Sequence, residues 1–173
     1  MRVKYVPNRL RRCCDRIARR APTSGGFTLI ELLVVISILA IMAGLAAPSM
    51  SRLIANQRVR AIATDLQLAL VKARAEAIKR NKDVTVAPTG GNWTAGWSIV
   101  DPENPGGPGL DIRGPSQGVA VATSVTQVVY SASGRATATA GSSFVFSSTA
   151  TPTARCLSID ASGRPYVKEG SSC

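Results

Sequence analysis

The sequence predicts an α+β protein in which a long N-terminal helix, first transmembrane and then amphipathic, packs on an antiparallel β-sheet domain. Three observations predict this class. An apolar run broken by only three polar side chains fills residues 27–47. Apolar residues then recur at three- and four-residue steps as far as Arg80. From residue 83 on, helical periodicity gives way to short segments rich in Thr, Ser, Val, Gly and Pro.

Residues 1–26 form a basic segment ahead of the apolar run. They contain eight Lys or Arg and one Asp, a net +7 of the chain's +11. Lys and Arg that flank a membrane span stay on the cytoplasmic side. We therefore expect a single-pass inner-membrane protein with a cytoplasmic N-terminus and a periplasmic C-terminal domain. Residues 1–26 are predicted to be a basic leader segment outside the folded domain.

The apolar run, residues 27–47, has the length of one membrane span. At about 1.5 Å per residue it covers roughly 30 Å, the thickness of a hydrocarbon core. Pro48 follows directly, and proline inside a helix removes a hydrogen bond and bends it. The alternative is that the helix simply ends at the membrane face.

Residues 48–82 are predicted to be the amphipathic part of the same helix. Their apolar residues form one stripe that should pack on a small sheet: Leu53, Val59, Ile62, Leu66, Leu70, Ala73 and Ala77. The last turn is basic, which suits the negative end of a helix dipole.

Residues 83–173 are predicted to form the antiparallel β-domain. Seven short alternating segments indicate strands: Asp83–Ala87, Gly96–Asp101, Val119–Thr123, Gln127–Ser131, Ser143–Ser147, Arg155–Ile159 and Pro165–Lys168. Trp93 and Trp97 are expected to supply core bulk, with an exposed interface as the alternative. The order of the strands does not follow from the pattern.

The chain offers no constellation typical of an enzyme or a metal site. The loop 101–118 holds Asp101, Glu103 and Asp111, whose spacing is not that of an EF-hand, so they are interpreted as solvating a surface loop. The sequence has no His, which leaves no nucleophile–base pair to assign. We expect no enzyme activity, no cofactor and no metal.

Two of the four cysteines are expected to form a disulfide. Cys13 and Cys14 belong to the leader, whereas Cys156 and Cys173 would lie in an oxidising compartment. The alternative, a zinc site, lacks a histidine and a second pair of thiols.

Glu31 is the one charge inside the apolar run. A carboxylate in hydrocarbon costs roughly 2.5–3.5 kcal/mol on insertion scales, so it needs a partner or a purpose. An ordinary secretory signal, ending near Gly44-Leu45-Ala46, and a plain membrane anchor both leave Glu31 unexplained. The run Gly26-Phe27-Thr28-Leu29-Ile30-Glu31 resembles the class III signal of type IV pilins and pseudopilins.

That resemblance implies a set of processing and assembly sites. A prepilin peptidase would cleave between Gly26 and Phe27, and the new N-terminal Phe27 would be methylated. Glu31 would pair with the N-terminal amine of a neighbouring subunit, or its own, and Pro48 would allow the helix to bend in a filament. The implied partners are the peptidase, other pilins or pseudopilins, the inner-membrane assembly platform and the membrane.

Segments of the β-region resemble the GspH/FimT branch of this class. They are Gly96-Trp97-Ser98-Ile99-Val100, the strand and Gly-Arg turn of residues 129–135, and residues 155–164 followed by Cys173. The branch implies a FimT-like minor type IV pilin that joins or primes the filament. The alternative is a GspH-like minor pseudopilin of a type II secretion system. A membrane-anchored binding domain that never polymerises is a third interpretation, against which Glu31 argues.

Some members of this branch bind DNA through a C-terminal Gly-Arg-x-Arg motif. Here the matching stretch begins Gly163-Arg164, but Tyr166 stands where the second Arg is expected. On a strand Arg164, Tyr166 and Lys168 share a face, and Arg155 and Arg135 join them if their strands are neighbours. We therefore name double-stranded DNA, bound without sequence preference, as a candidate partner. The alternative is a solvated rim, since Glu169 reduces the local charge and residues 27–173 carry only +4.

Overall fold

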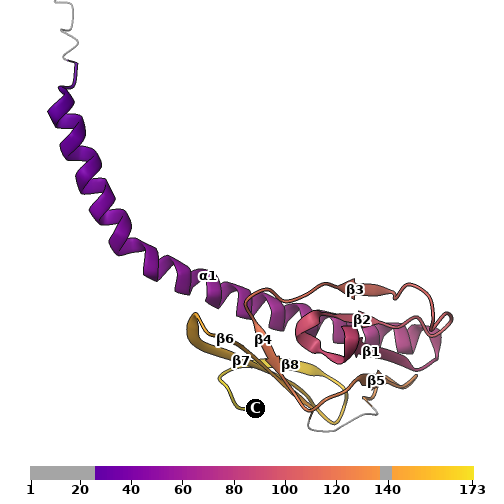
Figure 1. The fold of residues 1–173 in the computed structure, drawn as a ribbon. Helices are drawn as coiled ribbons and strands as arrows, with labels where there is room; N and C mark the ends of the chain where they lie inside the picture. Colours follow the sequence, from indigo (N-terminus) through magenta and orange to yellow (C-terminus); the bar gives the residue numbers. More distant parts are fainter. Residues whose placement is uncertain (1–25, 137–141) are drawn as a thin grey trace, which may run out of the picture. The chain divides into compact units, whose positions relative to one another are not determined.

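The computed structural model describes residues 26–136 and 142–173 (Figure 1). Apart from Gly26, the predicted leader, with Cys13 and Cys14, lies outside the described residues. The chain divides into two compact units, Met1–Ile41 and Met42–Cys173. The first consists, where described, of the start of helix α1, and the second contains the rest of α1 and all of the strands.

Helix α1 spans Leu29–Arg80 and is bounded by recognisable caps. At its start Thr28 Oγ1 accepts a hydrogen bond from the backbone N–H of Glu31 at 3.2 Å, as an N-cap residue does. At its end Asn81 adopts φ +52°, and the N–H of Lys82 donates to the carbonyl of Ala77 at 3.2 Å. This is a Schellman motif with Asn in the place usually taken by Gly. The helix continues through Pro48, so the alternative of a helix end at the membrane face is wrong.

One face of α1 is buried against the β-domain and forms what we call the core stripe. Its members are Ala55, Val59, Ile62, Ala63, Leu66, Ala69, Leu70, Ala73 and Ala77. The prediction was wrong for Leu53, which is 51% exposed. At about 100° per residue, Leu53 lies roughly a third of a turn away from Val59, whereas Ala55 lies almost in line with it.

The strands form two antiparallel four-stranded sheets. The first has the order β3-β2-β1-β5 and the second the order β4-β6-β7-β8. Their bounds are β1 Val84–Pro88, β2 Trp97–Ile99, β3 Asp111–Arg113, β4 Ala120–Ala122, β5 Val128–Tyr130, β6 Ser143–Ser148, β7 Thr151–Ile159 and β8 Pro165–Glu169. Two short 3₁₀ turns, η1 Thr89–Gly91 and η2 Trp93–Ala95, connect β1 to β2.

All seven predicted strands are present, with two corrections. Strand β3 was missed because its three residues are all exposed, so no burial alternation marks it inside a Pro- and Gly-rich loop. Strand β7 begins at Thr151 rather than Arg155. Pro152, a residue that strands disfavour, falls where the β6–β7 register shifts, and such an irregularity tolerates a missing N–H.

A single apolar core lies between α1 and both sheets (Figure 1). Leu66 and Leu70 of the core stripe belong to the same buried cluster as Val86 of the first sheet and Phe144 and Leu157 of the second. Trp93 and Trp97 are buried, as predicted. Trp93 packs edge-on against Phe144 with ring centroids 4.9 Å apart, and its Nε1 donates to the carbonyl of Val125 at 2.7 Å. The turn between β1 and β2 is therefore joined to β6 of the second sheet by an aromatic contact.

Candidate functional site

The predicted processing and assembly residues lie at the start of α1. Gly26, Phe27 and Glu31 are exposed, and the bond between Glu31 and Thr28 is half of a capping box. Among the described residues α1 alone is long and apolar enough to cross a membrane, and its most apolar 18-residue window has a mean hydropathy of 2.7. The capping of the helix by the Thr28 side chain was not predicted, although Thr-x-x-Glu is a visible capping signal in the sequence.

A second apolar stripe on α1, the outer stripe, is exposed. Leu68, Val71 and Ile78 belong to it, with Leu68 60% exposed, and at about 100° per residue they lie roughly opposite the core stripe. The sequence analysis considered only one stripe. A heptad signal was present: positions 54, 61, 68 and 75 and positions 57, 64, 71 and 78 are exposed throughout, and only Gln57 and Thr64 among them are polar.

Two turns of nearly identical sequence and geometry, the twin turns, stand side by side at the end of the β-domain. They are Ser131-Ala-Ser-Gly134-Arg135 and Asp160-Ala-Ser-Gly163-Arg164. In each, the first residue's N–H donates to the carbonyl of the arginine, at 2.9 and 3.1 Å, and the glycine N–H donates back to the first residue's carbonyl. A Cβ on Gly163 would lie 2.6 Å from the carbonyl oxygen of Gly134, so the two backbones are in contact.

The predicted DNA-contact residues separate into two groups. Arg135 and Arg164 come together at the twin turns and are exposed. Lys168 Nζ lies 5.2 Å from the ring centroid of Tyr166, so these two share a face of β8, as the strand period predicts. Arg155 belongs to neither group, because its Nη2 contacts Glu169 Oε1 at 2.5 Å and its side chain is only 14% exposed.

Asp160 is the first residue of the second twin turn, four residues before Arg164. It accepts from the Ser162 hydroxyl at 2.6 Å and from the backbone N–H of Arg164 at 2.8 Å. The Ser162 hydroxyl, followed by that N–H, holds the pKa of Asp160 below its ordinary value. The ionised carboxylate therefore fixes the turn that presents Arg164.

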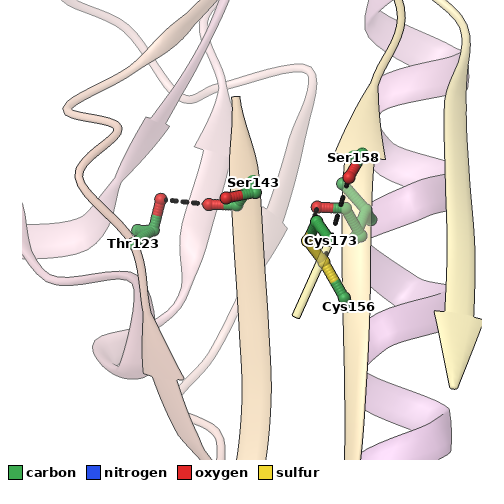
Figure 2. Close-up of a disulfide and its surroundings, with 6 residues drawn as sticks. Thr123, Ser143, Cys156, Ser158 and Cys173 are labelled. Carbon is green, nitrogen blue, oxygen red and sulfur yellow. Dashed lines mark hydrogen bonds between the residues drawn. A yellow bond between two sulfur atoms is a disulfide. The ribbon is translucent and has the colours of Figure 1, made fainter. Parts of the chain in front are cut away.

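A disulfide joins Cys156 of β7 to Cys173, as predicted, with the two Cα atoms 5.6 Å apart (Figure 2). Cys156 is buried, and its Sγ lies 3.8 Å from the Ser158 hydroxyl. Figure 2 also shows Thr123 donating to the carbonyl of Ser143 at 2.7 Å, which fixes the segment after β4 to β6. The disulfide holds the residues after β8 against β7.

The acidic side chains of loop 101–118 are engaged with α1, so their interpretation as merely solvated is wrong. Arg80 contacts Asp101 at 3.0 Å and Glu103 at 3.7 Å, and Lys72 contacts Asp111 at 2.8 Å. Arg80 also bonds Glu76 at 2.8 Å, which lowers the pKa of that carboxyl. No cluster of three or more potential metal-ligating side chains occurs within 26–136 or 142–173.

Comparison with known proteins agrees with this geometry. Residues 62–163 match the family model described as type II transport protein GspH, more than half of the chain. The chain belongs to the GspH family. Residues 22–47 of this GspH-family chain also match the prokaryotic N-terminal methylation motif.

Individual relatives of the GspH-family chain are pilin-like. It is 46% identical over 61 residues to the pilin-like protein PilA1 of Thermus thermophilus, and the match spans 34% of this chain and 36% of that protein. Two crystal forms of the type IV minor pilin FimU of Pseudomonas aeruginosa share its fold, with TM-scores of 0.56 and 0.55 at 20% and 22% identity. The two matches cover 68% and 66% of this chain, and 96% and 98% of the FimU chains.

Membership places the chain among minor type IV pilins and pseudopilins, a class of structural subunits. The class implies prepilin processing and association with other pilins. It also implies anchoring in a membrane through the apolar N-terminal helix before incorporation into a filament.

Proposed function

We propose that the chain is a FimT-like minor type IV pilin that joins or primes the pilus filament through helix α1. The outer stripe is the observation that carries this proposal. It leaves Leu68 and Val71 in contact with solvent, and Ile78, which is 53% exposed, borders the twin turns at Gly134. An apolar heptad face of this length is typical of helix–helix packing, and a neighbouring pilin helix is the partner that family membership supplies.

The processing sites complete this proposal. Cleavage between Gly26 and Phe27 and methylation of Phe27 would free an N-terminal amine at the start of α1. Glu31 would neutralise that amine on a neighbouring subunit, or its own, which offsets the cost of a carboxylate in hydrocarbon. Pro48 would let α1 bend on assembly, since proline lacks the N–H that continues a helix ladder. Residues 27–47 would be the membrane span, with 83–173 in the periplasm.

Charge placed on the outer stripe tests the assembly proposal. We expect Leu68→Glu/Val71→Glu to leave the unassembled protein folded, because both side chains are exposed, and to abolish its incorporation into filaments. Ala122→Glu is the control, because Ala122 is exposed but lies on β4 of the second sheet. Ile112 is unsuitable, since it lines the same groove as Leu68. Quantification of the chain in sheared filaments and in membranes measures both outcomes. Normal incorporation of the double variant would contradict the proposal.

A GspH-like pseudopilin of a type II secretion system remains the alternative in the same class. The family model that matches residues 62–163 carries the secretion description, whereas the FimU structures, described as type IV minor pilins, favour the pilus at the level of fold. Deleting the gene distinguishes the two: loss of pili with normal secretion supports the first, and blocked secretion with normal pili supports the second.

We also propose that this subunit contacts DNA, and the twin turns are the observation that favours it. They present Arg135 and Arg164 from two adjoining loops, and guanidinium groups bind phosphates bidentately. Arg74 adds to the positive charge there, since its Nε would lie 3.3 Å from a Cβ on Gly134. Tyr166 and Lys168 of β8 would extend the contact toward the C-terminus, whereas Arg155 is occupied by Glu169.

A salt-dependent titration of double-stranded DNA against the full-length chain in detergent tests this contact. Binding should weaken steeply with salt, and Arg135→Ala/Arg164→Ala should reduce the slope of log K against log salt by about 2, one phosphate per arginine. Lys82→Ala/Arg113→Ala removes the same charge elsewhere and should keep the slope. No binding at low salt, or equal losses in both double variants, would remove DNA as a partner.

A further inference from the structure

Three arginines that follow the apolar run, Arg52, Arg58 and Arg60, have no role in the functions described above. All three are exposed, and none forms an ion pair with another described residue. No acidic residue lies between Glu31 and Asp65 to neutralise them. We call these three residues the arginine collar.

The collar lies where α1 would leave the membrane. Arg52 comes five residues after Ala47 and Arg60 thirteen residues after it, which at 1.5 Å per residue is about 8 to 20 Å along the helix. The polar headgroup layer adds about 5–8 Å to each side of the hydrocarbon core, so Arg52 lies at its outer edge. Arg58 and Arg60 lie beyond it, and their side chains, which tilt toward the N-terminus of the helix, extend back toward the membrane surface. Cations beyond a span also oppose the positive-inside rule, so orientation does not explain them.

The distribution of the collar around α1 indicates the kind of partner. At about 100° per residue the three side chains leave the helix on three different sides, with gaps of roughly 80° to 160° between them. A protein that docks on one face would meet only one or two of them. An anionic membrane surface surrounds a helix that leaves it, and it attracts cations on every side of that helix over about one Debye length.

Arg58 and Arg60 each line a groove beside α1 that contains both apolar and polar side chains. Arg58 lines one of about 360 Å³ with Ile54, Ser51 and Thr149, and its Nη1 would lie 3.5 Å from a Cβ on Gly118.

Arg60 lines the second groove, of about 310 Å³, with Leu53, Gln57 and Thr153, beside the ion pair of Arg155 and Glu169. Each groove thus combines an exposed aliphatic side chain, a hydroxyl group and a guanidinium that pairs with no described residue. The guanidinium of each groove suits a phosphate group.

We propose that the arginine collar binds the headgroups of anionic phospholipids at the periplasmic surface of the membrane. The contact holds the unassembled subunit at one depth, and it must break when the subunit is drawn into a filament. This inference rests on the membrane span and periplasmic orientation proposed above, but not on filament assembly.

Lipid retention by the full-length chain tests the collar. The protein, purified in detergent, is titrated with phosphatidylglycerol and with phosphatidylcholine, and bound lipids are counted by native mass spectrometry. The wild type should retain phosphatidylglycerol in preference. Arg52→Ala/Arg58→Ala/Arg60→Ala should lose that preference, by as much as about fivefold per arginine. Lys79→Ala/Lys82→Ala/Arg113→Ala, which removes three cations elsewhere, should keep it.

Several outcomes would overturn the proposal. They are equal retention of the two lipids by the wild type, equal losses in the two triple variants, or displacement of phosphatidylglycerol by an equimolar amount of free glycerol 3-phosphate. Circular dichroism of each variant, compared with that of the wild type, verifies that it is folded. The lipid measurement uses unassembled protein. An outer-stripe variant that fails to assemble but still retains phosphatidylglycerol would therefore agree with the lipid proposal.

Discussion

Tyr130 shows how one residue's burial sets a measurable property of the domain. Its side chain is fully buried at the end of β5, and its hydroxyl has no hydrogen-bond partner among the described residues. Burial raises the pKa of Tyr130 to about 12, because the phenolate would lose its hydration. The ring contributes to the core, whereas the hydroxyl lacks the hydrogen bond that buried polar groups usually make.

We expect Tyr130→Phe to stabilise the domain and to change its response to alkali. The unpartnered hydroxyl costs about 1–3 kcal/mol, part of which the variant should recover. In the wild type the unfolded chain ionises near pH 10 and the folded chain near pH 12, so stability is full below pH 10 and falls as pH rises toward 12. That fall is about 2 kcal/mol at pH 11.5 and should be absent from the variant. Urea unfolding in detergent at pH 8 and pH 11.5 measures both effects, and an unchanged alkaline loss would contradict this account.

At the scale of the element, the twin turns depend on glycine for two reasons. Gly163 adopts φ +81°, a conformation that side chains disfavour. It also faces the backbone of the partner turn, with the carbonyl oxygen of Gly134 2.6 Å and the amide nitrogen of Ala136 2.9 Å from where its Cβ would lie. Gly91, at φ +77°, has the same conformation but open space around it.

We expect Gly163→Ala to destabilise the domain more than Gly91→Ala. Gly91→Ala should cost only the conformational strain, about 1 kcal/mol, whereas Gly163→Ala adds a backbone clash and should exceed about 2 kcal/mol. The free energies of unfolding of the two variants, measured side by side, give the difference. Equal losses would mean that the two turns do not pack as closely as described.

At the scale of the whole molecule, a disulfide links the C-terminal residue to the second sheet. Strand β8 is an edge strand, and the Cys156–Cys173 disulfide holds the three residues that follow Gly170 against β7. The bond closes a sequence separation of 17 residues. It should therefore act mainly by restricting the unfolded chain, since the native contacts of β8 with β7 exist without it.

We expect Cys156→Ala/Cys173→Ala to fold with the same secondary structure and to lose about 3 kcal/mol of stability. Circular dichroism would verify the fold, and denaturant midpoints with and without a reductant would measure the loss. The reductant should lower the wild-type midpoint toward that of the variant and leave the variant unchanged. A wild-type midpoint that does not respond to reduction would contradict a stabilising role.

Local chemistry in the sequence determined the long helix, its apolar start, seven strands, the buried tryptophans and the disulfide pair. Each of these leaves a periodic, compositional or counting signal in neighbouring residues. Tertiary structure decided which carboxylates of loop 101–118 reach α1, that Arg155 is paired with Glu169, and that β3 completes a sheet. It also brought Arg135 and Arg164 together from turns 29 residues apart. Such pairings depend on strand order, and no local pattern encodes strand order, because every antiparallel edge offers the same backbone hydrogen bonds.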